Sequence, residues 1–187
     1  QENLQLSQRY GPKHPRMIEA ESALTSARQA YREELEAAGH QVVYHDLYAE
    51  GFVPEFTAHD KATHKEPGVV AELQGYVDDL TWCDTLVLVY PTWWSGQPAI
   101  LKGWIDRVWV NGVAWELPDG ANRLRPALGG LRRLVVVTTH GSPKWVNAIQ
   151  GEGGKRTVTR SLRSMCHPLA RTSWIALYGV DRCGDAD

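Results

Sequence analysis

Residues 86–108 read LVLVYPTWWSGQPAILKGWIDRV, and the fold assignment starts from this stretch. Its first five residues form an apolar run rich in Val and Leu, which is typical of a strand covered on both faces in a parallel sheet. Pro91 ends the predicted strand because proline has no backbone N–H to donate. Two adjacent tryptophans follow in a predicted loop, and Pro98 suits the first turn of a helix with an apolar face. The order of strand, aromatic loop and helix predicts an open α/β sheet, which binds ligands beyond the carboxyl ends of its strands.

The rest of the chain alternates predicted helices with predicted strands. Helices are predicted at residues 19–39, 69–80, 98–110 and 157–165, and strands at residues 41–48, 85–90, 134–139 and 173–178. This alternation is typical of parallel βαβ units joined by right-handed crossovers. Residues 49–67 are predicted to be a surface connection and residues 115–130 a loop, because turn-forming residues are frequent in both. No repeat or linker divides the sequence, so we expect a single domain over residues 1–187.

The composition argues against several classes of function. A formal net charge of -2 gives no reason to expect nucleic acid or an anionic membrane as a partner, and no apolar run approaches the ~20 residues that span a bilayer. The three cysteines lack metal-ligand spacing, and their odd number favours a reducing cytoplasm. His59, Asp60 and His64 do not share a helix face, so no metal site is expected. A hydrolase is disfavoured because the chain has no G-x-S-x-G motif.

The stretch 86–108 resembles the flavin-binding loop of the NAD(P)H:quinone oxidoreductase family, a flavodoxin-like group. That family has a strand ending in an aromatic–proline pair, an aromatic-rich loop, and a Pro-Ala-Ile-Leu-Lys-Gly-Trp helix start, which residues 98–104 reproduce. The resemblance extends more loosely from Ser22 to Arg182. It implies an α/β flavodoxin-like three-layer sandwich with a five-stranded parallel sheet. The first strand is atypical, and the family's last helix is absent because the chain stops ten residues after Leu177.

Two alignments are open for the first strand and its phosphate loop. The family ends this strand in a His-Pro pair and has a serine five residues after the histidine. The first alignment uses residues 4–10 as the strand, His14 as the histidine and Ser22, eight residues on, as the serine. The second uses residues 16–18 as a stub of the strand and enters the helix directly at Ser22. We favour the first alignment, in which the resemblance makes His14 and Ser22 candidate flavin contacts.

The resemblance places one set of flavin contacts in the loop after the strand of residues 85–90. Its backbone N–H groups can bind the flavin edge, and an indole ring can pack against the flavin. The alternative is that the two tryptophans fill a gap in the core. The candidate contacts are Pro91, Thr92, Trp93, Trp94 and Ser95.

A second set of candidate contacts follows the strand of residues 134–139, which is predicted to lie beside the first loop in a parallel sheet. The candidates are Thr138, Thr139, His140 and Gly141. The family has Thr-Thr-Gly-Gly-Ser here, so His140 replaces a glycine and adds a side chain near the flavin pyrimidine. The alternative is that small and hydroxylated residues occur at any strand exit.

Two further aromatic residues are predicted at the substrate pocket. By resemblance, Trp115 lies where the family places an aromatic that borders the partner subunit's substrate pocket; the alternative is an ordinary interface residue. Trp145 lies near a tyrosine that some members use to stabilise charge on the reduced flavin, so it is a catalytic and substrate-binding candidate. An indole N–H can donate a hydrogen bond but cannot deliver a proton as tyrosine can. We therefore expect the proton to come from water or from His140, the other catalytic candidate.

The resemblance implies a flavin-dependent NAD(P)H:quinone oxidoreductase. We expect NADPH or NADH to reduce FAD, with FMN as the alternative, and two electrons to pass to a quinone-like acceptor by a ping-pong mechanism in a cytoplasmic homodimer. A second hypothesis is an ancillary regulatory subunit that docks on a potassium-efflux partner, as some proteins similar to this family do. A third is a degenerate member without flavin, suggested by the atypical first loop.

Overall fold

The computed structural model of the chain describes residue 26 and residues 29–118 and 120–182. The chain divides into two units, residues 1–45 and residues 46–187, which are described separately. The predicted first strand, His14 and Ser22 lie outside the described residues. The organisation as a single domain stays a prediction.

The described part of the first unit contains a helix over residues 29–37. It ends where the sequence predicted, because Gly39 has a φ of 84° and the His40 N–H donates to the Leu35 carbonyl oxygen at 3.0 Å, the pattern of a glycine cap. The predicted strand over residues 41–48 is wrong, since residues 41–46 have no regular structure and residues 47–50 form a turn. Val43 is 49% exposed and Tyr44 48% exposed, whereas a strand in a parallel sheet needs buried faces and a paired backbone.

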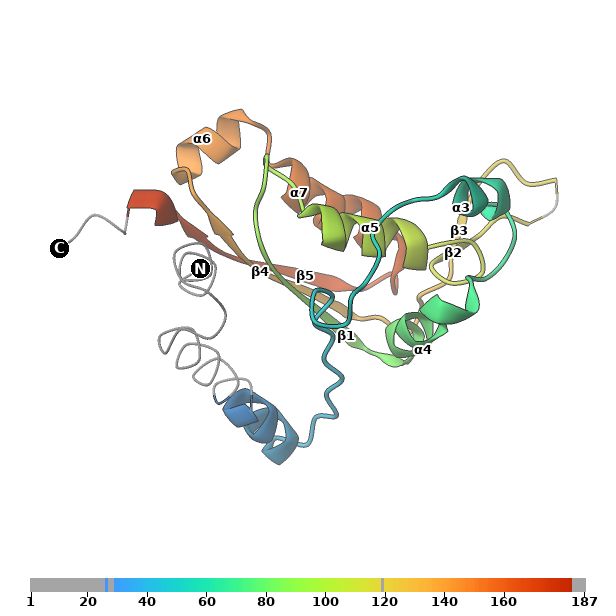
Figure 1. Cartoon of the computed structure of the whole chain (residues 1–187), viewed down its shortest axis with the longest axis horizontal. Coiled ribbons are helices and arrows are strands. Elements are labelled where there is room, and N and C mark those ends of the chain that lie inside the picture. The colour runs from blue at the N-terminus through green and yellow to red at the C-terminus, as the bar shows by residue number, and fades with distance from the viewer. Residues whose placement is uncertain (1–25, 27–28, 119, 183–187) are drawn as a thin grey trace. The chain divides into compact units, whose positions relative to one another are not determined.

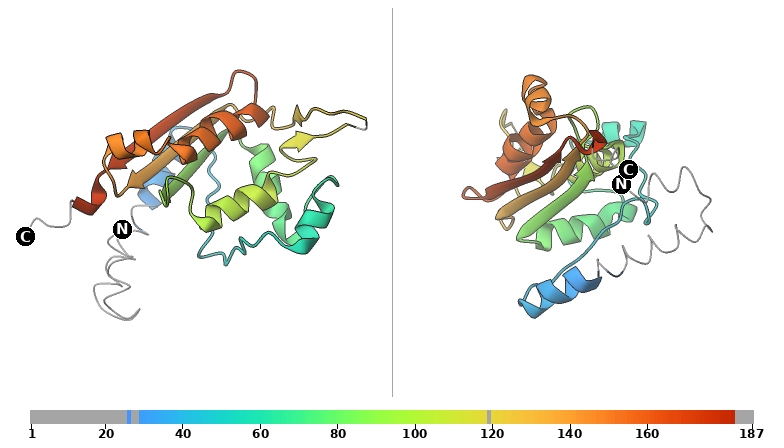
Figure 2. Two further views of the ribbon diagram at one scale, coloured as in Figure 1. Left: turned by 90° about the horizontal axis from the view of Figure 1, so that it is seen from above. Right: turned by 90° about the vertical axis from the view of Figure 1, so that its left-hand side faces the viewer.

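The second unit is built on a parallel sheet in the order β1-β4-β5 (Figures 1 and 2). The strands are β1 (Thr85–Pro91), β4 (Arg133–His140) and β5 (Arg171–Tyr178). They pair in a register that joins Val87 to Val135 and Val135 to Ser173. Three predicted strands are therefore confirmed. The five-stranded sheet is not, because the parallel sheet of the described residues has three strands.

The crossover helices cover one face of this sheet. α5 (Ala99–Val108) follows β1, and a helical run precedes β5, made of α7 (Gly153–Arg156), the π-helical η2 (Thr157–Leu162) and the 3-10 turn η3 (Arg163–Met165). Two right-handed crossovers that step in the same direction place their helices on the same face. Side-chain burial alternates accordingly: Leu134 and Val136 are 1% exposed, whereas Val89, on the opposite face, is 73% exposed. The core therefore lies between the strands and these helices.

Shorter elements complete the second unit, and some fall where the sequence predicted irregular chain. α3 (Ala58–Thr63) forms within residues 49–67 because Thr57 and Asp60 make a capping box, each side chain accepting the other's backbone N–H. β2 (Trp115–Glu116) and β3 (Arg125–Pro126) pair antiparallel within residues 115–130. The others are η1 (Ala71–Leu73), α4 (Gln74–Trp82), α6 (Lys144–Ile149) and η4 (Val180–Arg182).

The approach of Pro54 explains the glycine inside α5. A Cβ atom at Gly103 would overlap the carbonyl oxygen and the ring of Pro54. One turn later, the buried Arg107 donates to the Val53 carbonyl oxygen at 2.7 Å and forms an ion pair with Asp60 at 3.3 Å. Two residues of the quoted stretch thus dock the chain that precedes α3 onto α5.

Candidate functional site

The structure brings the two predicted flavin loops together at the carboxyl edge of the sheet. Pro91 of β1 pairs with Thr139 of β4, and the Thr92 N–H donates to the Thr139 carbonyl oxygen at 2.8 Å. The Thr92 and Thr138 hydroxyl oxygens lie 2.9 Å apart. The parallel register places these groups side by side, because strands that run in the same direction end at the same edge.

Residues 93–96, which we call the Trp turn, project the two tryptophans from this edge. The Trp93 N–H donates to the Gly96 carbonyl oxygen at 3.1 Å, and the Gly96 N–H donates back at 2.8 Å. Trp94 and Ser95 have φ values of 47° and 59°, so both central residues are left-handed, as in a type I′ turn. Trp93 is 59% exposed and Trp94 is fully exposed. The alternative that these tryptophans fill a gap in the core of the described chain is therefore wrong.

Asn147 of α6 fixes the tautomer of the neutral His140 side chain. The Asn147 amide nitrogen donates to the carbonyl oxygens of Ser142 at 3.2 Å and Pro143 at 3.0 Å, so its amide oxygen faces the His140 Nδ1 atom at 2.8 Å. Since that oxygen can only accept, Nδ1 carries the hydrogen and Nε2 carries a lone pair. Burial lowers the pKa of His140, partly offset by the Asn147 hydrogen bond and the Glu152 charge. The neutral ring is therefore favoured.

His140 lines a small cavity beside the Trp turn. Its Nε2 atom is buried and has no hydrogen-bond partner among the described residues. The imidazole stacks on Tyr178, with ring centres 4.6 Å apart and planes 15° from parallel. An unpaired buried acceptor of this kind suits an N–H or O–H donor from a ligand or a water molecule. Thr92, Ser95, Glu152, Lys155 and Trp174 line the cavity with it.

The Asp181 carboxylate lies directly against Gly141. A Cβ atom at residue 141 would overlap the carboxyl group of Asp181. This carboxyl group ends a flexible side chain that can move aside, so the predicted contact of Gly141 with a flavin stays a prediction.

Of the remaining predicted residues, Trp115 lies beyond the end of α5, whereas Trp145 lies on α6, which follows β4 at this edge. The Trp115 indole N–H donates to the Trp109 carbonyl oxygen at 3.1 Å, and its ring centre lies 5.6 Å from that of His64. Trp145 is 65% exposed on α6 and has no hydrogen bond or ring contact within the described part of the chain. Their predicted contacts with substrate stay predictions.

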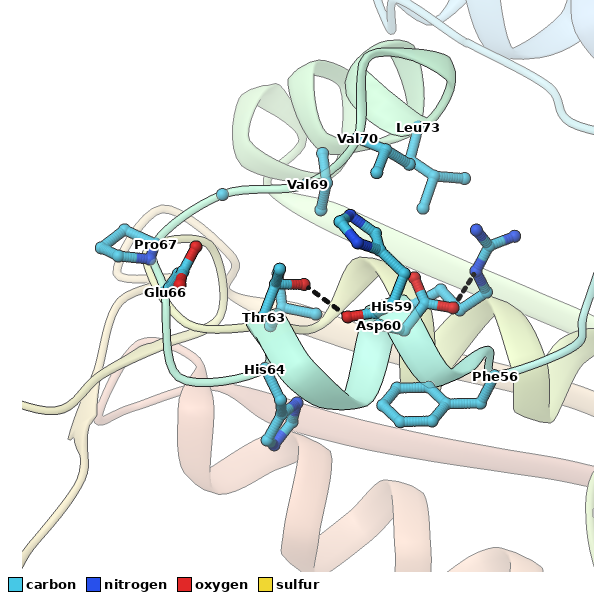
Figure 3. Close-up of a pocket in the computed structure, with 13 residues that line it drawn as sticks. Phe56, His59, Asp60, Thr63, His64, Glu66, Pro67, Val69, Val70 and Leu73 are labelled. Carbon is cyan, nitrogen blue, oxygen red and sulfur yellow. Dashed lines mark hydrogen bonds and ion pairs between the residues drawn. The ribbon is translucent and has the colours of Figure 1, made fainter.

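A second cavity, of about 270 Å³, lies between α3, the segment after it and α5 (Figure 3). Figure 3 shows the His59 ring pointing toward Val69. Burial alone would raise the pKa of Asp60, but the two hydrogen bonds from Thr57 and the Arg107 charge lower it overall. The residues that the structure describes contain no cluster of three potential metal ligands. Val69, Val70 and Leu73 give this cavity an apolar part, and its Asp60 and Arg107 charges pair with each other.

Several residues at the candidate site were not predicted from the sequence. Asn147 orients His140, and Gln150 and Gly154 contact the Trp turn. They fall between the predicted strand of residues 134–139 and the predicted helix of residues 157–165, where the sequence predicted no helix or strand. A contact of this kind depends on tertiary packing, and the hydrophobic pattern carries no signal for it.

Comparison with known proteins identifies the class. The chain belongs to the flavodoxin-like fold family, whose sequence pattern matches residues 14–174. Its relatives carry the names of NAD(P)H oxidoreductases and quinone reductases, which confirms the resemblance to the NAD(P)H:quinone oxidoreductase family.

Three of these relatives show how far the similarity extends. The chain is 40% identical over 96 residues to an uncharacterized NAD(P)H oxidoreductase of Escherichia coli (strain K12), covering 48% of this chain and 49% of that protein. It is 30% identical over 152 residues to the Rattus norvegicus NAD(P)H dehydrogenase (quinone) 1, covering 70% and 53%. The solved NAD(P)H:quinone oxidoreductase of Methanothermobacter marburgensis shares the fold with a TM-score of 0.65 and 24% identity, over 81% and 77% of the two chains. The chain thus spans about half the length of the curated relatives it matches.

The part of the chain that the structure describes contains no helix that is both long and apolar enough to cross a bilayer.

Proposed function

We propose that this protein is a flavin-dependent NAD(P)H:quinone oxidoreductase. It takes two electrons from NADPH or NADH and passes them to a quinone-like acceptor in a ping-pong reaction, with FAD as the flavin and FMN as the alternative. One observation carries the proposal: two tryptophans are exposed side by side on a turn at the carboxyl edge of a parallel sheet. Large apolar faces placed together in water at the ligand-binding edge of an α/β sheet favour a flat partner.

The residues at this edge fit a flavin ring. The Trp turn offers indole faces for packing and the backbone of residues 92–95, while residues 138–141 offer a second backbone segment beside it. The unpaired Nε2 atom of His140 is an acceptor that suits a ring N–H. When bound, a flavin supplies reversible uptake and release of a hydride. The candidate phosphate contacts His14 and Ser22 lie outside the described residues.

The side chains at the site have separable roles in this proposal. Trp93 and Trp94 hold the ring and exclude water from one of its faces. Neutral His140 accepts a hydrogen bond at Nε2, so it orients a donor or takes up a proton there. This assignment narrows our sequence expectation, in which water or His140 supplied the proton. A neutral ring with its hydrogen on Nδ1, bound to Asn147, has none to give from Nε2. Water is then the expected proton donor.

Assembly as a symmetric homodimer is part of the proposal. Trp104 and Trp109 pack in the core around α5, so the half-buried Trp115, the first residue of β2, is the member of this aromatic cluster that a partner could contact. In a two-fold dimer formed around this region, Trp115 of one protomer would border the acceptor pocket of its partner. Light scattering at micromolar concentration tests this, with a mass near twice that of one chain as the expected result and a monomeric mass as the contradicting one.

The activity is tested by following NADPH and NADH oxidation by the purified, flavin-loaded chain in the presence of a simple quinone. We expect turnover that requires added flavin, and parallel lines in double-reciprocal plots when both substrates are varied. A chain that binds flavin but shows no turnover with any quinone contradicts the enzymatic proposal and favours the regulatory-subunit hypothesis. A chain that binds neither FAD nor FMN favours the flavin-free hypothesis.

A further inference from the structure

The Trp turn has a conformation that its own sequence disfavours. A type I′ turn is usually formed by Asn-Gly or a similar pair, because both central residues need a positive φ. Here the central residues are Trp94 and Ser95, and a left-handed conformation costs on the order of 1–2 kcal/mol for an ordinary side chain. Such a conformation persists only where surrounding contacts fix it.

Those contacts come from the segment between α6 and α7. The Gly154 N–H donates to the Ser95 carbonyl oxygen at 2.6 Å, and the Ser95 hydroxyl donates to the Gln150 side-chain oxygen at 2.5 Å. On the far side of the turn, the Gln97 amide donates to the Gly154 carbonyl oxygen at 3.0 Å. The first two of these hydrogen bonds hold the left-handed residue Ser95, one at its backbone and one at its side chain.

Glycine at residue 154 allows this close approach of the two backbones. A Cβ atom there would lie 3.1 Å from the Ser95 oxygen and 3.1 Å from the Gly96 Cα atom, and both are backbone atoms with little room to move. The neighbouring Gly153 differs, because a Cβ atom on it would make only an ordinary contact of 3.5 Å with the Ser95 oxygen. The close approach is therefore specific to Gly154.

We propose that Gln150 and Gly154 form a latch that holds the Trp turn in its left-handed conformation and thereby positions Trp94 against the flavin. They are positioning residues, since they act through Ser95. This inference rests on the proposed function for its ligand, but the existence of the latch is independent of any ligand. A latch of this kind reduces the conformational freedom that flavin binding would otherwise have to remove.

The experiment combines two measurements on Gln150→Ala and Gly154→Ala in the full chain. The first is amide hydrogen exchange of residues 93–96 without flavin, and the second is titration with FAD followed by flavin fluorescence. Each substitution should weaken or remove one such hydrogen bond. Amide exchange at Trp93 and Gly96 should then be about three- to tenfold faster, and FAD binding should be about three- to tenfold weaker. Gln150→Glu keeps an acceptor for the Ser95 hydroxyl and should restore both values. Gly153→Ala and Ile149→Ala, the latter at a 79% exposed position, are the matched controls and should change neither.

The outcomes separate the latch from the proposed function. Unchanged exchange in both test variants overturns the latch. Faster exchange with unchanged FAD affinity overturns the positioning role. Urea unfolding shows whether a variant has lost stability as a whole. A general loss of stability, with faster exchange throughout the sheet, would overturn a local latch. If the wild-type chain binds no flavin, the proposed function fails, and the exchange rates alone still decide whether the latch holds the turn.

Discussion

The Nδ1 atom of His140 lies 2.8 Å from the side-chain oxygen of Asn147. This hydrogen bond joins the last residue of β4 to α6, and both side chains are buried. It fixes which imidazole nitrogen carries the hydrogen of the neutral ring.

Removing the Asn147 side chain should destabilise the fold. Asn147→Ala leaves the buried His140 Nδ1 without its acceptor and removes two further hydrogen bonds to the Ser142 and Pro143 carbonyl oxygens, which keep their backbone donors. A buried polar group left unpaired costs about 1–3 kcal/mol. The free energy of unfolding, measured with urea, should fall by that amount. Gln74→Ala is the matched control, because it removes an amide that pairs with Asp78 on an exposed helix face, and it should change stability by less than about 0.5 kcal/mol. Equal effects of the two substitutions would contradict the account of Asn147.

Protonation of His140 should make stability fall in acid. Burial lowers the pKa of His140 in the folded chain below its ordinary value of about 6.5, so at acid pH the unfolded chain binds more protons there. The free energy of unfolding should therefore decrease as the pH falls below about 6.5, and this contribution should be fully present above that value. Urea unfolding of the wild type and His140→Gln across this range isolates the contribution as the difference between the two curves. A contribution that grows as the pH falls would show that the folded state prefers the protonated ring.

Gly103 should not tolerate a side chain. Gly103→Ala pushes a Cβ atom into Pro54, and overpacking of this kind costs about 1–3 kcal/mol. The matched control is Gly75→Ala in α4, where a Cβ atom meets nothing within 4 Å. Alanine at that helical position should raise the free energy of unfolding by about 0.5–1 kcal/mol. Thermal or urea unfolding measures both, and a stabilising Gly103→Ala would contradict the contact with Pro54.

Much of the second unit could be predicted from the sequence, because its strands and central helix carry strong hydrophobic patterns. β1, β4 and α5 lie within two residues of their predicted bounds. The predicted strand over residues 41–48 is wrong because its apolar run, residues 42–44, is too short to specify a buried strand. α3 was missed because its signal is the Thr57 and Asp60 capping box, in a segment without buried residues.

The candidate site was predictable only where it follows the strands. The register of β1 and β4 brings Thr92 and Thr138 together, as any parallel pair of strand ends would. Gln150 and Gly154 were not predictable, since nothing in the local sequence says which turn they contact. His140 was recognised as unusual, but its tautomer depends on the Asn147 amide, which only the fold places beside it.

Titration of the purified chain with FAD and FMN, comparing the wild type with Trp94→Ala, tests the central claim most directly. Trp82→Ala is the control, because Trp82 is another exposed tryptophan, 50% exposed, and lies at the end of α4, before β1 begins. The account predicts saturable binding of one flavin by the wild type and by Trp82→Ala. It predicts that Trp94→Ala binds more weakly by about 1–3 kcal/mol, the loss expected when an aromatic stacking partner is removed. Unchanged affinity in Trp94→Ala, or no saturable binding of either flavin by the wild type, would contradict it.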